Sequence, residues 1–310
     1  MIEQSFIFGP ENHLIGTATL PAQANPVPGN LMALLTNAGV IPRIGPHRLN
    51  VKLARRFAQL GLGSLRYDMS GLGDSRRSSS RLPTGEQFVA DTIAAMDLAK
   101  SQFGCEQFFM VGFCSGGDVA HLTALTDARL RGVLMWDSYV YPTRKARALG
   151  LLHRLRRNSL GSAASKIAAR VGSLVKPSAP STDAAAGESM PTGPTIFGRS
   201  QMPARDDFGN RIRTLVDRGV ELQFLYSGGE PEWYNYEAQF RDMFDSYGFV
   251  DRVGYAYLVR NDHTLIQPHS QLALIASVEH WLERRLMPRL RQEASLPREA
   301  AQLPAKLMPA

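Results

Sequence analysis

Short apolar runs and helical repeats alternate along the first 138 residues of the chain. Strand-length apolar runs are followed by segments whose apolar residues recur every three or four positions, such as residues 50–60, which end at Gly61. The same alternation returns at residue 204 and continues to residue 287. Strands and helices that alternate at this spacing build a mostly parallel sheet with helices on both faces. The pattern therefore predicts an α/β fold with two sequence segments in one core, residues 1–138 and 204–287.

Residues 139–203 break the pattern. The first part has a helical composition rich in Leu and Ala, and residues 177–203 contain five prolines among small and polar residues. We expect a basic helical cap with a flexible Pro/Ala/Ser segment, inserted into a single sheet domain. Residues 288–310 contain further prolines and are expected to form a frayed tail.

The net charge of +7 is concentrated in this insertion. Residues 138–182 contain nine basic residues and no acidic residue, so the rest of the chain carries 7 − 9 = −2. A single basic segment without interleaved aromatic residues is a poor signature of nucleic-acid binding. We therefore expect no nucleic-acid partner, and we expect the charge to act only locally.

The composition also excludes several classes of protein. No run of about 18 apolar residues is present, which predicts no stable membrane insertion, and the N-terminus does not resemble a signal peptide. Two cysteines are too few for a disulfide scaffold and are typical of a reducing cytoplasm. No His, Asp or Glu grouping has the spacing of metal ligands, so neither a metal nor another cofactor is expected.

The segment Gly112-Phe113-Cys114-Ser115-Gly116-Gly117 follows an apolar strand and precedes a helix. A nucleophile elbow has the form Gly-x-nucleophile-x-Gly at such a junction, because the strained turn leaves no room for side chains two residues before and after its centre. Centred on Cys114 the flanking residues are glycines, whereas centred on Ser115 one of them would be Phe113. The spacing therefore favours Cys114 as the nucleophile. The positive end of the helix dipole would stabilise its thiolate.

The partners of the nucleophile follow it along the chain in this architecture. His263 lies in the loop before the last long helix, where the general base belongs, and Glu230 follows the strand at residues 221–226, where the orienting acid belongs. Asp137, at the end of the preceding strand, is the alternative acid. The backbone amides of Gly39 and Ser115 are expected to form the oxyanion hole.

Several motifs make the chain resemble the α/β-hydrolase superfamily. They are the elbow GFCSGG, the loop YDMSGLGDS at residues 67–75 and NDHT around His263. The stretch LLTNAGVIPRIGPHRLNVKLARRFAQLGLGSLRYDMSGLGDS is similar to bacterial hydrolases of the serine aminopeptidase S33-like type, many of which carry Gly-x-Cys-Ser-Gly. The resemblance covers residues 31–286 apart from the insertion and implies an α/β-hydrolase fold with a Cys-His-acid site. The chain departs from the usual pattern by having Asn37-Ala38 in place of His-Gly, a cysteine nucleophile, and Glu in place of Asp after the seventh strand.

A cysteine nucleophile narrows the expected chemistry. Its acyl intermediate is a thioester, so transfer to an alcohol, amine or thiol stays thermodynamically open beside hydrolysis. We expect hydrolysis or acyl transfer on a thioester, ester or lactone, with a small-molecule acyl substrate carried on coenzyme A or a carrier protein. The alternative is a non-catalytic binding or scaffold protein of the same fold, in which Cys114 would be unreactive.

Overall fold

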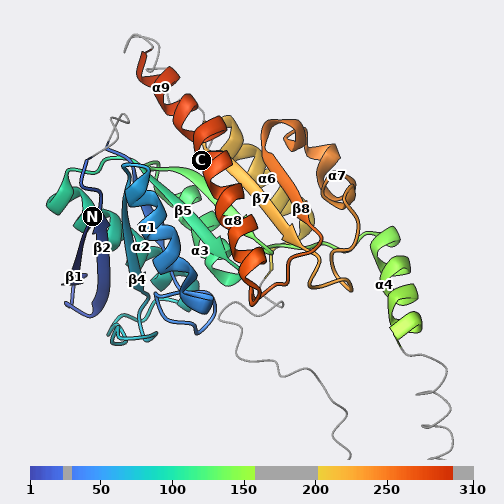
Figure 1. The fold of residues 1–310 in the computed structure, drawn as a ribbon, viewed down its shortest axis with the longest axis horizontal. Coiled ribbons are helices and arrows are strands. Elements are labelled where there is room, and N and C mark those ends of the chain that lie inside the picture. Colours follow the sequence, from blue (N-terminus) through green and yellow to red (C-terminus); the bar gives the residue numbers. More distant parts are fainter. Residues whose placement is uncertain (24–29, 158–201, 296–310) are drawn as a thin grey trace, which may run out of the picture.

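A computed structural model describes residues 1–23, 30–157 and 202–295, and these residues form one eight-stranded sheet (Figure 1). The strand order is β1-β2-β4-β3-β5-β6-β7-β8. β2 pairs antiparallel with β1 and with β4, and the strands from β4 to β8 are parallel. The strands are β1 Ile2–Phe8, β2 Leu14–Leu20, β3 Met32–Leu35, β4 Gly63–Asp68, β5 Phe108–Phe113, β6 Leu130–Trp136, β7 Glu221–Ser227 and β8 Gly254–Leu258. The predicted α/β class is confirmed.

Helices cover both faces of the sheet and divide the core into two layers. α1 (Leu49–Gln59) and α8 (Pro268–Trp281) pack on one face. The opposite face is covered by α2 (Thr84–Phe103), α3 (Ser115–Thr126) and α6 (Arg205–Asp217), with the short α7 (Gln239–Phe244) beside them. The central strands β3 and β5 are buried on both faces, as parallel strands normally are.

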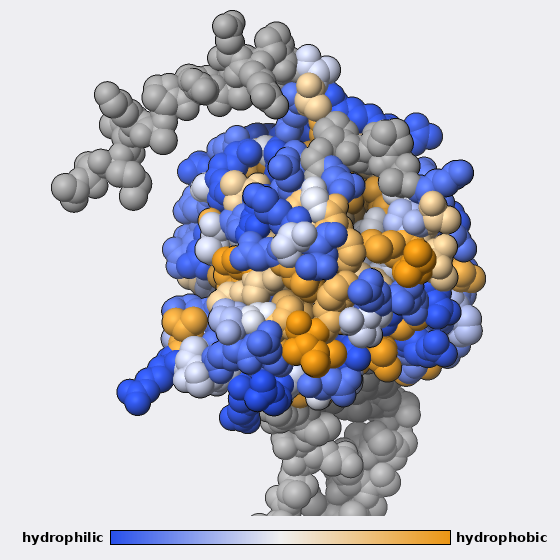
Figure 2. All heavy atoms as spheres, turned by 90° about the vertical axis from the view of Figure 1, so that its left-hand side faces the viewer, coloured by the Kyte–Doolittle hydropathy of each residue, from blue (hydrophilic) through white to orange (hydrophobic). Residues whose placement is uncertain are grey.

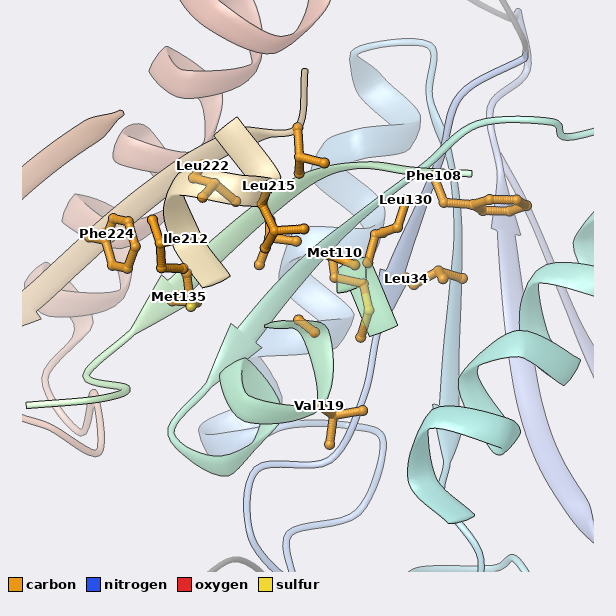
Figure 3. Close-up of a cluster of buried hydrophobic side chains, with 14 of the residues drawn as sticks. Leu34, Phe108, Met110, Val119, Leu130, Met135, Ile212, Leu215, Leu222 and Phe224 are labelled. Carbon is orange, nitrogen blue, oxygen red and sulfur yellow. The ribbon is translucent and has the colours of Figure 1, made fainter. Parts of the chain in front are cut away.

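Figure 3 shows the second of these layers, in which strand side chains pack against α3 and α6. Met110, Met135 and Phe224 are essentially inaccessible to solvent, and Val119 and Ile212 face them from the helices. Burying an apolar side chain of this size contributes about 1.5–3 kcal/mol. This packing fixes the position of α3, whose first turn follows Cys114.

The described start of the expected cap is the helix α4 (Arg144–Arg157), which Figure 1 shows beyond the β8 edge of the sheet. It is anchored at Ala146, which is buried and whose carbonyl accepts a hydrogen bond from Asn235. The remainder of the expected insertion, residues 158–201, lies outside the described residues. The strands on either side of the insertion, β6 and β7, pair directly with each other.

The C-terminal end differs from the frayed tail expected from residue 288. α8 continues through a π-helical turn, Leu282–Leu286, into α9 (Met287–Ser295), and Leu290 of α9 is buried. Apolar side chains at helical spacing outweigh the helix-breaking tendency of Pro288, which lies in the first turn of α9, where proline is tolerated. The remaining tail, residues 296–310, is outside the described residues.

Figure 2 looks onto the β1 edge of the sheet, where apolar side chains gather among charged ones. Ile2 and Ile7 of β1 are exposed there, and Phe6 packs edge-on against Phe103 of α2. Among the described residues, none of the helices is long and apolar enough to cross a membrane.

Candidate active site

The turn between β5 and α3 holds Cys114 in a strained backbone conformation. Its φ and ψ angles are 51° and −120°, a region that non-glycine residues rarely occupy. A Cβ atom at Gly112 would lie 2.5 Å from the backbone of Gly116 and Gly117, and one at Gly116 would lie 2.8 Å from the carbonyl oxygen of Asn37. Both glycines are therefore required by close backbone approach, as the sequence pattern predicted.

Backbone and side-chain hydrogen bonds stabilise this turn from the β6 side. The Cys114 amide donates to the carbonyl oxygen of Trp136 (2.9 Å), and the Ser138 hydroxyl donates to the carbonyl oxygen of Cys114 (2.7 Å). Strain of this kind costs on the order of 1–3 kcal/mol and persists only where the surroundings enforce it. The Cys114 side chain, which is half-buried, is thereby fixed at the carboxyl edge of the sheet.

His263 lies between Cys114 and a carboxylate. Its Nδ1 atom is 3.0 Å from Oδ2 of Asp137, and its side chain also interacts with Cys114. Burial by itself would lower the pKa of His263, but the Asp137 carboxylate and Cys114 outweigh burial and raise the pKa to about 11. The Trp136 indole donates to the backbone carbonyl of His263 (3.0 Å), which fixes the loop that carries the imidazole.

Asp137 is positioned by donors on the neighbouring strand. Its backbone has a φ of 49°, and its amide donates to the carbonyl of Leu225 in β7. The amide and the hydroxyl of Ser227 each donate to the Asp137 carboxylate at 2.6 Å. With the His263 bond, the buried carboxylate has three partners, which is how a buried charge is normally tolerated. One Asp137 oxygen therefore faces the imidazole in a fixed direction.

Of the two acids that the sequence offers, Asp137 is the one whose hydrogen bond to His263 the structure shows. The Nδ1 hydrogen bond of the imidazole goes to Asp137, the alternative acid. Beyond β7 the turn runs against the His263 loop, since a Cβ at Gly228 would overlap the Val259 carbonyl and one at Gly229 would lie 2.5 Å from the His263 amide nitrogen. Glu230 follows this tight contact. Its backbone carbonyl accepts hydrogen bonds from the amides of Trp233 and Tyr234.

One of the two amides predicted for the oxyanion hole already has an acceptor. The Gly39 amide donates to the Ser115 hydroxyl (2.9 Å). The loop that carries Gly39 is held by buried Asp68, whose carboxylate accepts from the Asn37 side chain (2.8 Å) and from the Arg43 amide (2.6 Å). Asp68 thus has the structural role expected of a turn carboxylate.

Two hydroxyl groups that build the site have no distinctive motif in the sequence. Ser138 holds the Cys114 carbonyl, and Ser227 holds the Asp137 carboxylate. Each is at or just beyond the carboxyl end of a parallel strand, and that position was the available signal. Single serines are too common at strand ends for such a signal to select them.

The other cysteine is chemically separate from this site. Cys105 is buried, its sulfur lies 3.8 Å from the sulfur of Met32, and burial raises the pKa of its thiol to about 11. Both cysteines are free thiols. Within the described ranges no cluster of three or more His, Cys, Asp or Glu residues could hold a metal ion.

Solved structures share this fold across nearly the whole chain. An esterase of Pyrococcus furiosus is 13% identical, with a TM-score of 0.56 over 92% of this chain and 91% of that chain. A serine hydrolase of Xanthomonas campestris, described as lacking a lid, is 11% identical, with a TM-score of 0.53 over 92% and 94%. An α/β-hydrolase of a Penicillium species is 16% identical, with a TM-score of 0.52 over 93% and 99%. The fold is therefore that of an α/β-hydrolase.

The sequence itself identifies the family. The model of the serine aminopeptidase S33 family matches residues 47–204, just over half of the chain, and the chain belongs to this family. No curated protein matches the chain. Membership of the family supports a hydrolytic function.

Proposed function

We propose that this protein is an acyl hydrolase or acyltransferase that uses Cys114 as its nucleophile, with His263 as the general base and Asp137 as the orienting acid. The observation that supports the proposal best is the continuous chain from the strained Cys114 through His263 to the Asp137 carboxylate. A nucleophile, a base and a third group that orients the base are the parts that covalent acyl transfer requires.

The reaction follows from these positions. The Cys114 sulfur attacks the acyl carbon while His263 holds the thiol proton, and the leaving group departs with that proton. His263 then removes a proton from water or from an acceptor, which attacks the acyl-Cys thioester and regenerates the thiol. Asp137 keeps the Nδ1 proton in place, so that Nε2 is the atom that exchanges protons.

Exposed apolar side chains at the mouth of the site favour an apolar acyl group. Val40 and Ile44 are exposed in the loop after β3, and Val259 and Ile266 are exposed in the loop after β8. These loops carry Gly39 and His263, and both lie at the carboxyl edge of the sheet with Cys114. An apolar acyl chain would cover these side chains when it binds.

The class of acyl donor is proposed from charge and chemistry. A thioester, ester or lactone suits a thiolate, which attacks amides poorly. Residues 138–182 contain basic residues and no acidic ones, so this segment would attract an anionic carrier such as coenzyme A or a carrier protein. The attraction would come from Arg154, Arg156 and Arg157 of that segment. The side chains of these arginines lie outside the described part of the chain. Two free thiols fit a reducing compartment such as the cytoplasm.

The decisive experiment is detection of an acyl adduct by intact-mass measurement after exposure to a panel of acyl thioesters and activated esters. We expect one acyl group on Cys114 in the wild type, none in Cys114→Ala, and normal labelling in the matched control Cys105→Ala, since Cys105 is buried. Cys114→Ala should also abolish turnover, because the centre of the turn then carries no nucleophile. Full turnover in Cys114→Ala would refute the proposal. An unreactive Cys114 would favour the alternative, a non-catalytic binding protein of this fold.

A further inference from the structure

The side chain of Ser115 lies between the first turn of α3 and the loop that carries Gly39. Ser115 is the first residue of α3 and directly follows Cys114. Its hydroxyl accepts the amide hydrogen of Gly39 at 2.9 Å, so it lies between the two elements expected to form the oxyanion hole. It is 8% exposed, which shields the hydroxyl from competing water.

The bond from Gly39 leaves the hydroxyl proton of Ser115 unused. A serine hydroxyl has one proton to donate and two lone pairs to accept with. The Gly39 amide occupies one lone pair, and within the described part of the chain no hydrogen bond uses the Ser115 proton. A donor that accepts a hydrogen bond at the same oxygen is polarised and donates more strongly.

We propose that the Ser115 hydroxyl is a side-chain donor of the oxyanion hole, polarised by the Gly39 amide. This inference rests on the proposed function of Cys114. When the thiolate attacks, the carbonyl π electrons move to oxygen, and the Ser115 O–H donates a hydrogen bond to that oxyanion without losing its proton. When the carbon–oxygen double bond re-forms, the bond to Ser115 weakens and the leaving group departs. The Ser115 amide donates to the same oxygen.

The loop after β3, which has Asn37-Ala38 in place of the usual His-Gly pair, is held close to the start of α3. The Asn37 side chain and the Arg43 amide donate hydrogen bonds to the Asp68 carboxylate, which fixes the loop. A Cβ atom at Gly116 would lie 2.8 Å from the Asn37 carbonyl oxygen. The loop therefore runs directly along the first turn of α3. Gly39 reaches the Ser115 hydroxyl from this position.

Two reactions of the same cysteine separate this role from a merely structural one. Hydrolysis of a p-nitrophenyl ester passes through an oxyanion, whereas alkylation of Cys114 by iodoacetamide does not. We expect Ser115→Ala to lower kcat for the ester on the order of 10²-fold, as loss of one oxyanion donor does, with KM nearly unchanged. The rate of Cys114 alkylation should equal that of the wild type, and Ser115→Thr, which keeps a hydroxyl, should recover most of kcat.

Ser64→Ala is the matched control, because it removes a fully buried hydroxyl that has no hydrogen-bond partner among the described residues. It should leave both rates unchanged. Wild-type kcat in Ser115→Ala would overturn the inference, and so would a parallel fall of ester hydrolysis and alkylation, which would show that Ser115 only shapes the turn. Failure of the proposed function is distinguishable, because Cys114→Ala would then retain turnover.

Discussion

Two histidines bond to one short segment, residues 137–139, and their surroundings differ. His263 bonds to Asp137, is about a quarter exposed and has a pKa raised to about 11. His121 is fully buried, and its Nδ1 atom lies 3.1 Å from the Tyr139 hydroxyl. Burial lowers the pKa of His121 to about 3. The same side chain is therefore charged at neutral pH in one region and neutral in the other.

The comparison shows that the partners of an imidazole can outweigh its burial. Asp137 and Cys114 together do so at His263, whereas burial dominates at His121. Asp118 interacts with the Tyr139 hydroxyl, and burial raises the pKa of Asp118 to about 7. His121 thus bonds to a phenol where His263 bonds to a carboxyl group. The first region is suited to moving protons, whereas the second is suited to holding Tyr139 in place.

Removing the carboxylate should have the largest effect on the first region. Asp137→Asn keeps the shape of the side chain but cannot hold the protonated imidazole, so we expect turnover to fall on the order of 10²–10⁴-fold. Steady-state kinetics of ester and thioester hydrolysis measure the loss. Glu230→Gln is the matched control and should stay close to wild type. A large loss in Glu230→Gln together with normal turnover in Asp137→Asn would restore Glu230 as the acid.

The charge difference between the histidines can be measured directly. In NMR titrations of the ring nitrogens, we expect His263 to remain protonated above pH 9 and His121 to remain neutral down to about pH 4. Asp137→Asn should lower the pKa of His263 and leave His121 unchanged. A neutral His263 at pH 7 in the wild type would contradict the ion-pair interpretation.

The raised pKa of His263 also makes the free energy of unfolding depend on pH. A group whose folded-state pKa is raised stabilises the fold below its unfolded pKa of about 6.5, and this contribution is lost as the pH rises through the folded pKa. Cys114→Ala is the suitable background, because no thiol then exchanges the proton. Without Cys114 the Asp137 carboxylate is the remaining group that raises the pKa of His263. The free energy of unfolding should therefore fall as the pH rises above about 6.5, and the double variant with Asp137→Asn should show a smaller fall.

The smallest effect is expected in the second region. Tyr139→Phe removes the hydroxyl that bonds to His121 and interacts with Asp118, so buried polar atoms lose their partner. We expect a loss of about 1–3 kcal/mol in the free energy of unfolding, measured in urea, with turnover changed less than tenfold. Tyr247→Phe, whose hydroxyl bonds to Asp206 at the surface, is the control and should cost less. Loss of turnover as large as in Asp137→Asn would mean that the two regions act as one.

The sequence by itself determined the sheet, its helices and the position of the strained turn. Alternating apolar runs predict parallel strands because such strands are buried on both faces, and Gly112 and Gly116 identify Cys114 because backbone contacts at 2.5–2.8 Å admit no side chain. His263 could be placed because the order of strands and loops along the chain fixes which loop reaches the sheet edge. These are local or topological properties, and a single sequence carries them.

Only the tertiary structure decided which acid faces His263. Asp137 and Glu230 both follow parallel strands, so sequence position allowed either. The outcome depends on the left-handed backbone at Asp137, on the Ser227 donors of a strand 90 residues away, and on the contact of Gly228 and Gly229 with the His263 loop. The direction of one carboxylate is set by packing between segments distant in sequence, and no local pattern encodes it.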